Sequence, residues 1–213
     1  MPEVLGNLKG IRNSIIAELN KIYDFKIDNA QIINQELAIT LTKITNFINR
    51  EISVYIDRAG TVQSVCVGDN NTVNLPNTNN RRGEKKLCGV RCVHTHPGGN
   101  ANLSGIDLSA LRLNRFDAML AIGANENEAE KSLISFAFIT GLDEKNEFTL
   151  SCSEPITLEE AENIFFPNLI SMIEKSLSKN EGNFNINLQK EKAILVGMEY
   201  NGMENTLGWT QED

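Results

Sequence analysis

The chain has 213 residues, 41% of them hydrophobic, and its 28 acidic and 20 basic residues give a net charge of −8. This length and apolar content indicate a globular protein with a sizeable core and exclude an intrinsically disordered chain. The acidic balance argues against a broad basic surface that binds phosphate backbones, so we expect no direct nucleic-acid binding by this segment.

The sequence has no apolar run of eighteen or more residues, and its start, MPEVLGNLKG, lacks the regions of a signal peptide. The cysteines are too few and too scattered for a disulfide framework, and they stand at Cys66, Cys88, Cys92 and Cys152. Together these features predict a cytoplasmic protein without a membrane span.

The first third of the chain predicts two helices and a hairpin. Apolar residues at helical spacing predict amphipathic helices over 10–23 and over 34–49, the second with Asn34 as its N-cap. Two strands follow at 52–57 and 61–67, joined by a turn around Gly60.

Residues 68–86 are polar and rich in asparagine, and they predict a long surface loop. The loop carries the one compact basic cluster of the chain, Arg81, Arg82, Lys85 and Lys86. Such clusters are usually solvated, and contact with an anionic partner is the alternative.

Beyond this loop, strands and helices alternate. Buried strands are expected at 87–96, 117–123 and 132–139, with a helix at 104–115 between the first two. This order predicts an α/β fold in which a mixed β-sheet is flanked by helices.

A long amphipathic helix is expected over 157–178, and a new strand begins within 190–200. We therefore divide the chain into N-terminal helices that pack on the core, an α/β domain with its closing helix, and the start of a further, truncated domain. These parts are 1–50, 51–182 and 183–213.

Both histidines of the chain lie at the end of the strand 87–96. Alternation along a strand places His94 and His96 on one face, roughly 6.6 to 7 Å apart. Ser104 is a predicted helix N-cap, and Asp107 lies three positions on, where its side chain points back toward the N-terminus of that helix. Two histidines and one aspartate form a ligand set that fits a catalytic zinc, although such a site also accepts other divalent ions.

Each part of this pattern has a simpler interpretation. The Ser104-to-Asp107 spacing is close to an ordinary capping box, and a lone buried histidine is usually a core residue. A mixed zinc site that includes Cys92 is excluded, because Cys92 lies roughly 13 Å from His96 along an extended strand.

The spacing His-x-His-Pro, six residues, then Ser-x-x-Asp resembles the JAMM (MPN+) metalloprotease motif. The resemblance implies a JAMM- and cytidine-deaminase-like layout, zinc ligation by His94, His96 and Asp107, and a hydrogen bond from Ser104 to the tetrahedral intermediate. It also implies a general base at the start of an earlier strand, and Glu51 stands there. The family often has glycine three residues after this glutamate, where this chain has Val54.

A second resemblance covers nearly the whole chain. The opening GNLKG, the segment 56–62 leading to 67–69, and the strand-like AILVG at 193–197 are similar to the long N-terminal extension of clostridial-type HflX GTPases. This implies a GTP-binding protein that associates with the large ribosomal subunit and has a GTPase domain in cis. The chain has no GxxxxGK[ST] loop, so GTP and Mg²⁺ would bind only in that following domain.

Two functions remain open at this point. The first is a zinc-dependent (iso)peptidase with a peptide substrate, and the second is a noncatalytic module that regulates or docks the GTPase. A base-modifying hydrolase ranks last, because the chain lacks the Cys-x-x-Cys zinc pair of deaminases.

Overall fold

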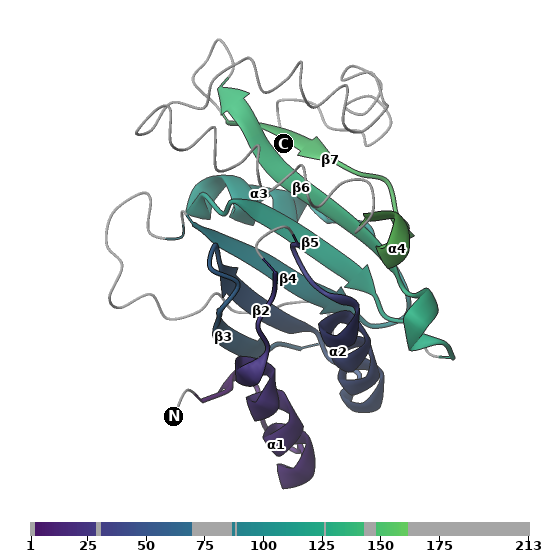
Figure 1. Ribbon diagram of the computed structural model, residues 1–213. Helices are drawn as coiled ribbons and strands as arrows, with labels where there is room; N and C mark the ends of the chain where they lie inside the picture. Colours follow the sequence, from purple (N-terminus) through teal and green to yellow (C-terminus); the bar gives the residue numbers. More distant parts are fainter. Residues whose placement is uncertain are drawn as a thin grey trace.

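The computed structural model describes residues 3–28, 31–69, 87, 89–125, 127–142 and 148–161. Figure 1 shows the described elements. In chain order they are β1 (Leu5–Gly6), α1 (Asn13–Lys21), the 3-10 turn η1 (Ile22–Asp24), α2 (Gln35–Ile48), β2 (Ile52–Asp57), β3 (Val62–Val67), β4 (Val90–His96), α3 (Gly105–Asn114), β5 (Ala118–Gly123), the 3-10 turn η2 (Ala129–Lys131), β6 (Leu133–Leu142), β7 (Phe148–Cys152), β8 (Ile156–Thr157) and α4 (Leu158–Glu160).

The strands form one sheet in the order β1-β3-β2-β4-β5-β6-β7, and β8 pairs with β6. The pairs β1/β3 and β4/β5 are parallel, and the other pairs are antiparallel. Helix α3 makes the crossover that joins the parallel strands β4 and β5, as such a pair requires. The predicted class, α/β with a mixed sheet flanked by helices, is confirmed.

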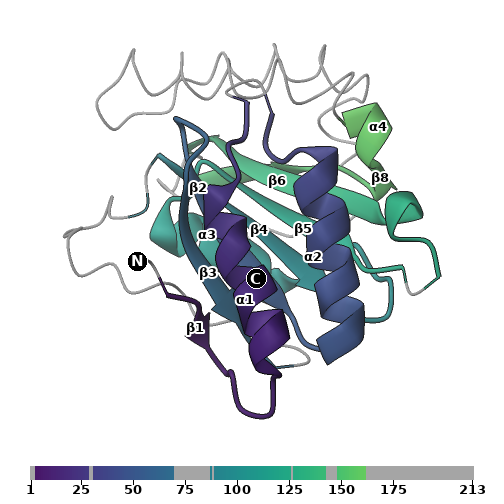
Figure 2. The same ribbon diagram turned by 60° about the horizontal axis from the view of Figure 1, so that its bottom comes forward.

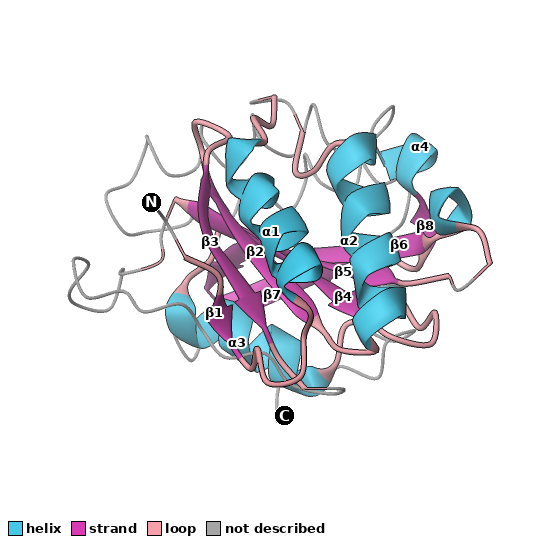
Figure 3. Ribbon diagram, turned by 90° about the horizontal axis from the view of Figure 1, so that it is seen from below, coloured by secondary structure: helices cyan, strands magenta, loops and turns pink. Residues whose placement is uncertain are grey.

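Helices lie on both faces of the sheet. Helices α1 and α2 run side by side over one face (Figure 2), and α3 lies on the opposite face (Figure 3). Because side chains alternate along each strand, every central strand contributes to two cores. The core under α1 and α2 contains Val54 and Val93, and the core under α3 contains Tyr55 and Cys92.

Helix α2 shows why the sequence prediction succeeded in this region. The side chain of Asn34 accepts a hydrogen bond from the backbone N–H of Leu37 at 2.9 Å, as an N-cap does. The helix ends where Asn49 adopts a left-handed conformation, with φ of 51°. Between these caps, Leu41 and Ile44 face the core.

Several boundaries differ from the predictions. Helix α1 begins at Asn13, three residues later than predicted. Strand β4 begins at Val90 rather than at residue 87, because Leu87 and Gly89 form a turn in which Gly89 has a φ of +85°. The sequence analysis did not predict β1, β7 or β8, since strands of two to five residues give little periodic signal.

Some predictions lie outside the described residues. These are most of the loop 68–86 with its basic cluster, the helix 157–178 beyond residue 161, the strand start at 190–200 and the domain 183–213. Within the described residues, no helix combines the length and the apolar character needed to cross a bilayer.

Candidate metal centre

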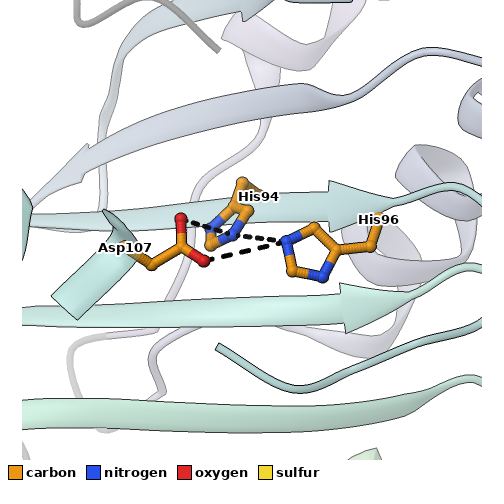
Figure 4. Close-up of side chains that lie close together, drawn as sticks. All are labelled: His94, His96 and Asp107. Carbon is orange, nitrogen blue, oxygen red and sulfur yellow. Dashed lines mark hydrogen bonds and ion pairs between the residues drawn. The ribbon is translucent and has the colours of Figure 1, made fainter. Parts of the chain in front are cut away.

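The two histidines meet at the C-terminal end of β4. Strand alternation places both side chains on one face of the sheet, as predicted, and that face is the one that α3 covers. The Nε2 atoms of His94 and His96 are 3.0 Å apart, and the rings stand edge to face. Figure 4 shows both rings turned toward the same side chain, that of Asp107.

Asp107 reaches the histidines from the first turn of α3. Its Oδ1 lies 3.4 Å from His94 Nε2, and its Oδ2 lies 4.0 Å from His96 Nε2. A capping box fixes this position, because Asp107 Oδ2 accepts from the backbone N–H of Ser104 at 2.7 Å. The helix cap and the candidate ligand are therefore the same carboxylate.

A glycine-rich turn orients His96. Pro97 ends the strand, and Gly98 and Gly99 adopt positive φ angles of 81° and 82° that glycine tolerates. The turn returns the carbonyl of Asn100 to His96, whose Nδ1 donates to it at 2.9 Å. This bond leaves the lone pair on Nε2, facing the other two side chains, as in histidines that ligate metals.

The donor atoms fit a metal ion. Ligands at the usual distances from a tetrahedral zinc lie roughly 3.3 Å from one another. The distances of 3.0 and 3.4 Å between the facing atoms are close to that value, and the third, 4.0 Å from His96 Nε2 to Asp107 Oδ2, is longer. The three side chains form a group of potential ligands within 4.8 Å, and Cys92 is not part of it. Nitrogen and carboxylate donors suit zinc and several other divalent ions.

The site holds strongly perturbed charges. Burial disfavours charge on His94, but the bond to the Asp107 carboxylate outweighs burial and raises the pKa of the imidazole to about 10. Burial also disfavours charge on Asp107, yet His94 and Ser104 lower the pKa of its carboxyl well below the usual range. Burial and the charge of His94 lower the pKa of His96. In the absence of a metal, a proton on His94 balances the aspartate.

Glu51 lies beside these residues on the same face. The antiparallel register pairs Ser53 of β2 with His94 of β4. Two residues before Ser53 on one strand therefore correspond to two residues after His94 on the other, which places Glu51 next to His96. Glu51 is 8% exposed, and its backbone bonds to Gly68 and Asp69 hold it next to the extension of β3. Burial, opposed by the charge of His94 and reinforced by that of Asp107, raises the pKa of its carboxyl to about 7.

Ser104 is engaged within the capping box. Its hydroxyl donates to Asp107 Oδ2 at 2.7 Å and accepts from the Asp107 backbone N–H at 3.2 Å. This is the capping arrangement that the spacing predicts. Its hydrogen bond to a reaction intermediate stays a prediction.

The sequence analysis missed residues that support the site. Thr95 lies between the two histidines on the opposite face, and its hydroxyl bonds Thr45 of α2 at 2.6 Å and the N–H of Ile52 at 3.0 Å. Asn100 holds His96, and Gly123 leaves room for the turn. The alternation that separates Thr95 from the histidines could have identified it as a buried hydroxyl.

No protein-family model matches this chain, and no curated protein matches it either.

Proposed function

We propose that this chain carries a zinc-dependent hydrolase site of the JAMM type, which acts on peptide or isopeptide bonds. The observation that carries the proposal is the convergence of His94, His96 and Asp107 on one point, with Glu51 on the same face of the sheet. The histidines and the aspartate would hold the metal. A buried carboxyl with a pKa of about 7 suits proton transfer near neutrality.

When bound, zinc supplies a Lewis acid that polarises a carbonyl oxygen and activates water at neutral pH. Glu51 takes the proton of the water whose oxygen attacks the carbonyl carbon. Glu51 then delivers that proton to the amine nitrogen as the carbon–nitrogen bond breaks, and the second proton of the water passes from the new carboxylic acid to the amine, which leaves a carboxylate and an ammonium group. Ser104 exchanges its bond to Asp107 for one to the carbonyl oxygen as charge develops there.

Metal content and hydrolysis test this proposal in two steps. Protein purified without chelators or metal-affinity resin should contain about one zinc per chain by elemental analysis. His96→Ala should lose the zinc. Glu51→Gln should keep the zinc and lose cleavage of a library of peptides and isopeptide-linked lysines, read by mass spectrometry. Zinc retained in His96→Ala contradicts the ligand assignment.

One observation favours a second function, a noncatalytic module. The hydroxyl of Ser104 makes two bonds within the cap and is committed to Asp107. In that case the domain regulates or docks a partner domain. A zinc-loaded protein that cleaves none of the library, with Glu51→Gln equal to the wild type in every assay, supports this alternative.

We also propose that the domain belongs to the N-terminal extension of an HflX-type GTPase, which acts in the cytoplasm and binds the large ribosomal subunit. The similarity of the opening segment, of the segment 56–62 leading to 67–69, and of residues 193–197 supports this assignment. The coding sequence beyond residue 213 tests it. A GxxxxGK[ST] loop after a strand supports the proposal, and a stop codon or an unrelated domain contradicts it. Co-sedimentation of the full-length protein with 50S subunits tests the partner.

A further inference from the structure

Ser53 lies in the β-sheet next to the candidate metal centre. It sits on β2, where it pairs with His94 of β4 on one side and with Cys66 of β3 on the other. Directly opposed residues in neighbouring strands project to the same face, so the hydroxyl of Ser53 lies beside the imidazole of His94. Ser53 is only 1% exposed.

The hydroxyl of Ser53 is a buried polar group with no hydrogen-bond partner among the described residues. Tyr55 and Cys66 lie near this hydroxyl, and its contact with them opposes the rise that burial causes in the pKa of both groups, but neither contact has the geometry of an ordinary hydrogen bond. Native proteins keep few such groups, because desolvation without a partner destabilises the fold. The other serines of this face are satisfied, since Ser64 bonds Cys66 and Ser135 donates to the carbonyl of Ala101.

His94 needs a group of this kind if it ligates a metal. Its Nε2 faces His96 and Asp107, so Nε2 is the ligating atom and Nδ1 must carry the proton. Metal-bound histidines almost always donate this second N–H to an oxygen. His96 donates to the Asn100 carbonyl, whereas His94 is 4% exposed and shielded from solvent.

We propose that Ser53 is the positioning residue of His94, and that its hydroxyl oxygen accepts the Nδ1–H when Nε2 ligates a metal ion. Rotation about a single torsion moves this hydroxyl among three staggered positions. The inference rests on the proposed metal site and does not depend on hydrolysis. Its rival is Cys92, two residues before His94, whose thiol already contacts the His94 ring as a hydrogen-bond partner and raises its pKa, but a thiol is a weak hydrogen-bond partner.

The experiment compares Ser53→Ala with two matched variants. Zinc affinity is measured by competition with a chromophoric chelator, and thermal stability is measured without metal. Ser53→Ala should weaken zinc binding by about tenfold or more, the usual effect of losing an outer partner of a ligand. The Tm of the metal-free variant should be unchanged or higher, because an unsatisfied buried hydroxyl is removed. Ser64→Ala, a buried serine of the same face, should bind zinc as the wild type does.

A spectroscopic measurement gives an independent readout. In the zinc-loaded wild type, ¹⁵N NMR of the histidines should show a slowly exchanging Nδ1–H on His94, and Ser53→Ala should lose that protection. Equal zinc affinity in Ser53→Ala and wild type overturns the positioning role and leaves the metal site intact. Weaker binding in Cys92→Ala alone assigns the role to the thiol and also overturns it. A wild type that binds no zinc overturns the proposed function together with this inference.

Discussion

Gly123 lies so close to Gly99 that a β-carbon at Gly123 would stand 2.2 Å from the Gly99 carbonyl oxygen and 2.7 Å from the backbone nitrogen of Ala101. Gly123 ends β5 directly beside His96 of β4. The missing side chain therefore lets the turn after β4 fold over the sheet and present the Asn100 carbonyl to His96.

This contact predicts that Gly123→Ala displaces the turn. The variant should lose about 1–3 kcal/mol of stability, as overpacking usually does. It should also bind zinc about tenfold more weakly, because His96 loses the carbonyl that orients it. Gly105→Ala is the matched control: nothing lies within 4 Å of its β-carbon, and it sits at the start of α3 beside Asp107. Equal zinc affinity in both variants would show that the turn does not support the site.

The charge balance at His94 predicts a pH dependence. The pKa of His94 is raised from 6.5 to about 10 in the folded protein. Because the folded pKa exceeds the unfolded one, the stabilisation is complete below about pH 6.5 and is lost as the pH rises toward 10. The Tm of the metal-free protein should therefore fall between pH 7 and pH 10.

Zinc should remove this dependence, because the metal takes the place of the proton on His94. Binding near pH 7.5 should then release about one proton per zinc. Calorimetric titrations in two buffers with different ionisation enthalpies measure this number. A Tm that does not change with pH in the metal-free protein, or zinc binding without proton release, contradicts the charge assignment.

The dual role of Asp107 predicts that two substitutions separate the helix cap from the metal site. In Asp107→Asn, an amide oxygen still accepts from the Ser104 N–H, so the helix cap is kept, while zinc binding and the stabilisation by the charge pair with His94 are lost. Asp107→Ala removes both roles and should also lose about 0.5–2 kcal/mol, as cap removal does. Chemical denaturation of the metal-free variants and zinc titration measure the two effects. Equal stability of the two variants would show that the cap contributes nothing.

The buried hydroxyl pair behind the site predicts a structural role for Thr95. Its hydroxyl bonds Thr45 and the N–H of Ile52, the residue after Glu51. Thr95→Val keeps the shape but leaves these groups unsatisfied, so it should cost about 1–3 kcal/mol. Thr95→Ser keeps the hydroxyl and should lose less. Urea denaturation compares the two, and a valine variant as stable as the serine variant would contradict the argument.

Local patterns in the sequence were sufficient to predict the two parts of the site, the histidine pair on the strand and the aspartate on the helix. Strand alternation placed His94 and His96 on one face, and the capping signal placed Asp107 in the first turn of a helix. Both inferences use interactions between residues at most three positions apart, and such interactions can be read from residue order. For the same reason the capped helix α2 was predicted within one residue at each end.

Only the tertiary structure decided which other residues lie next to these candidate ligands. The antiparallel register between β2 and β4 puts Glu51 and Ser53 beside the histidines, and the close approach of Gly99 to Gly123 brings Asn100 to His96. The register between two strands and the position of a loop on the sheet depend on contacts between segments that are distant in sequence. Such contacts leave no periodic signal in either segment. The sequence by itself determined the candidate ligands, and the packing of the sheet and its turn determined the residues that orient them.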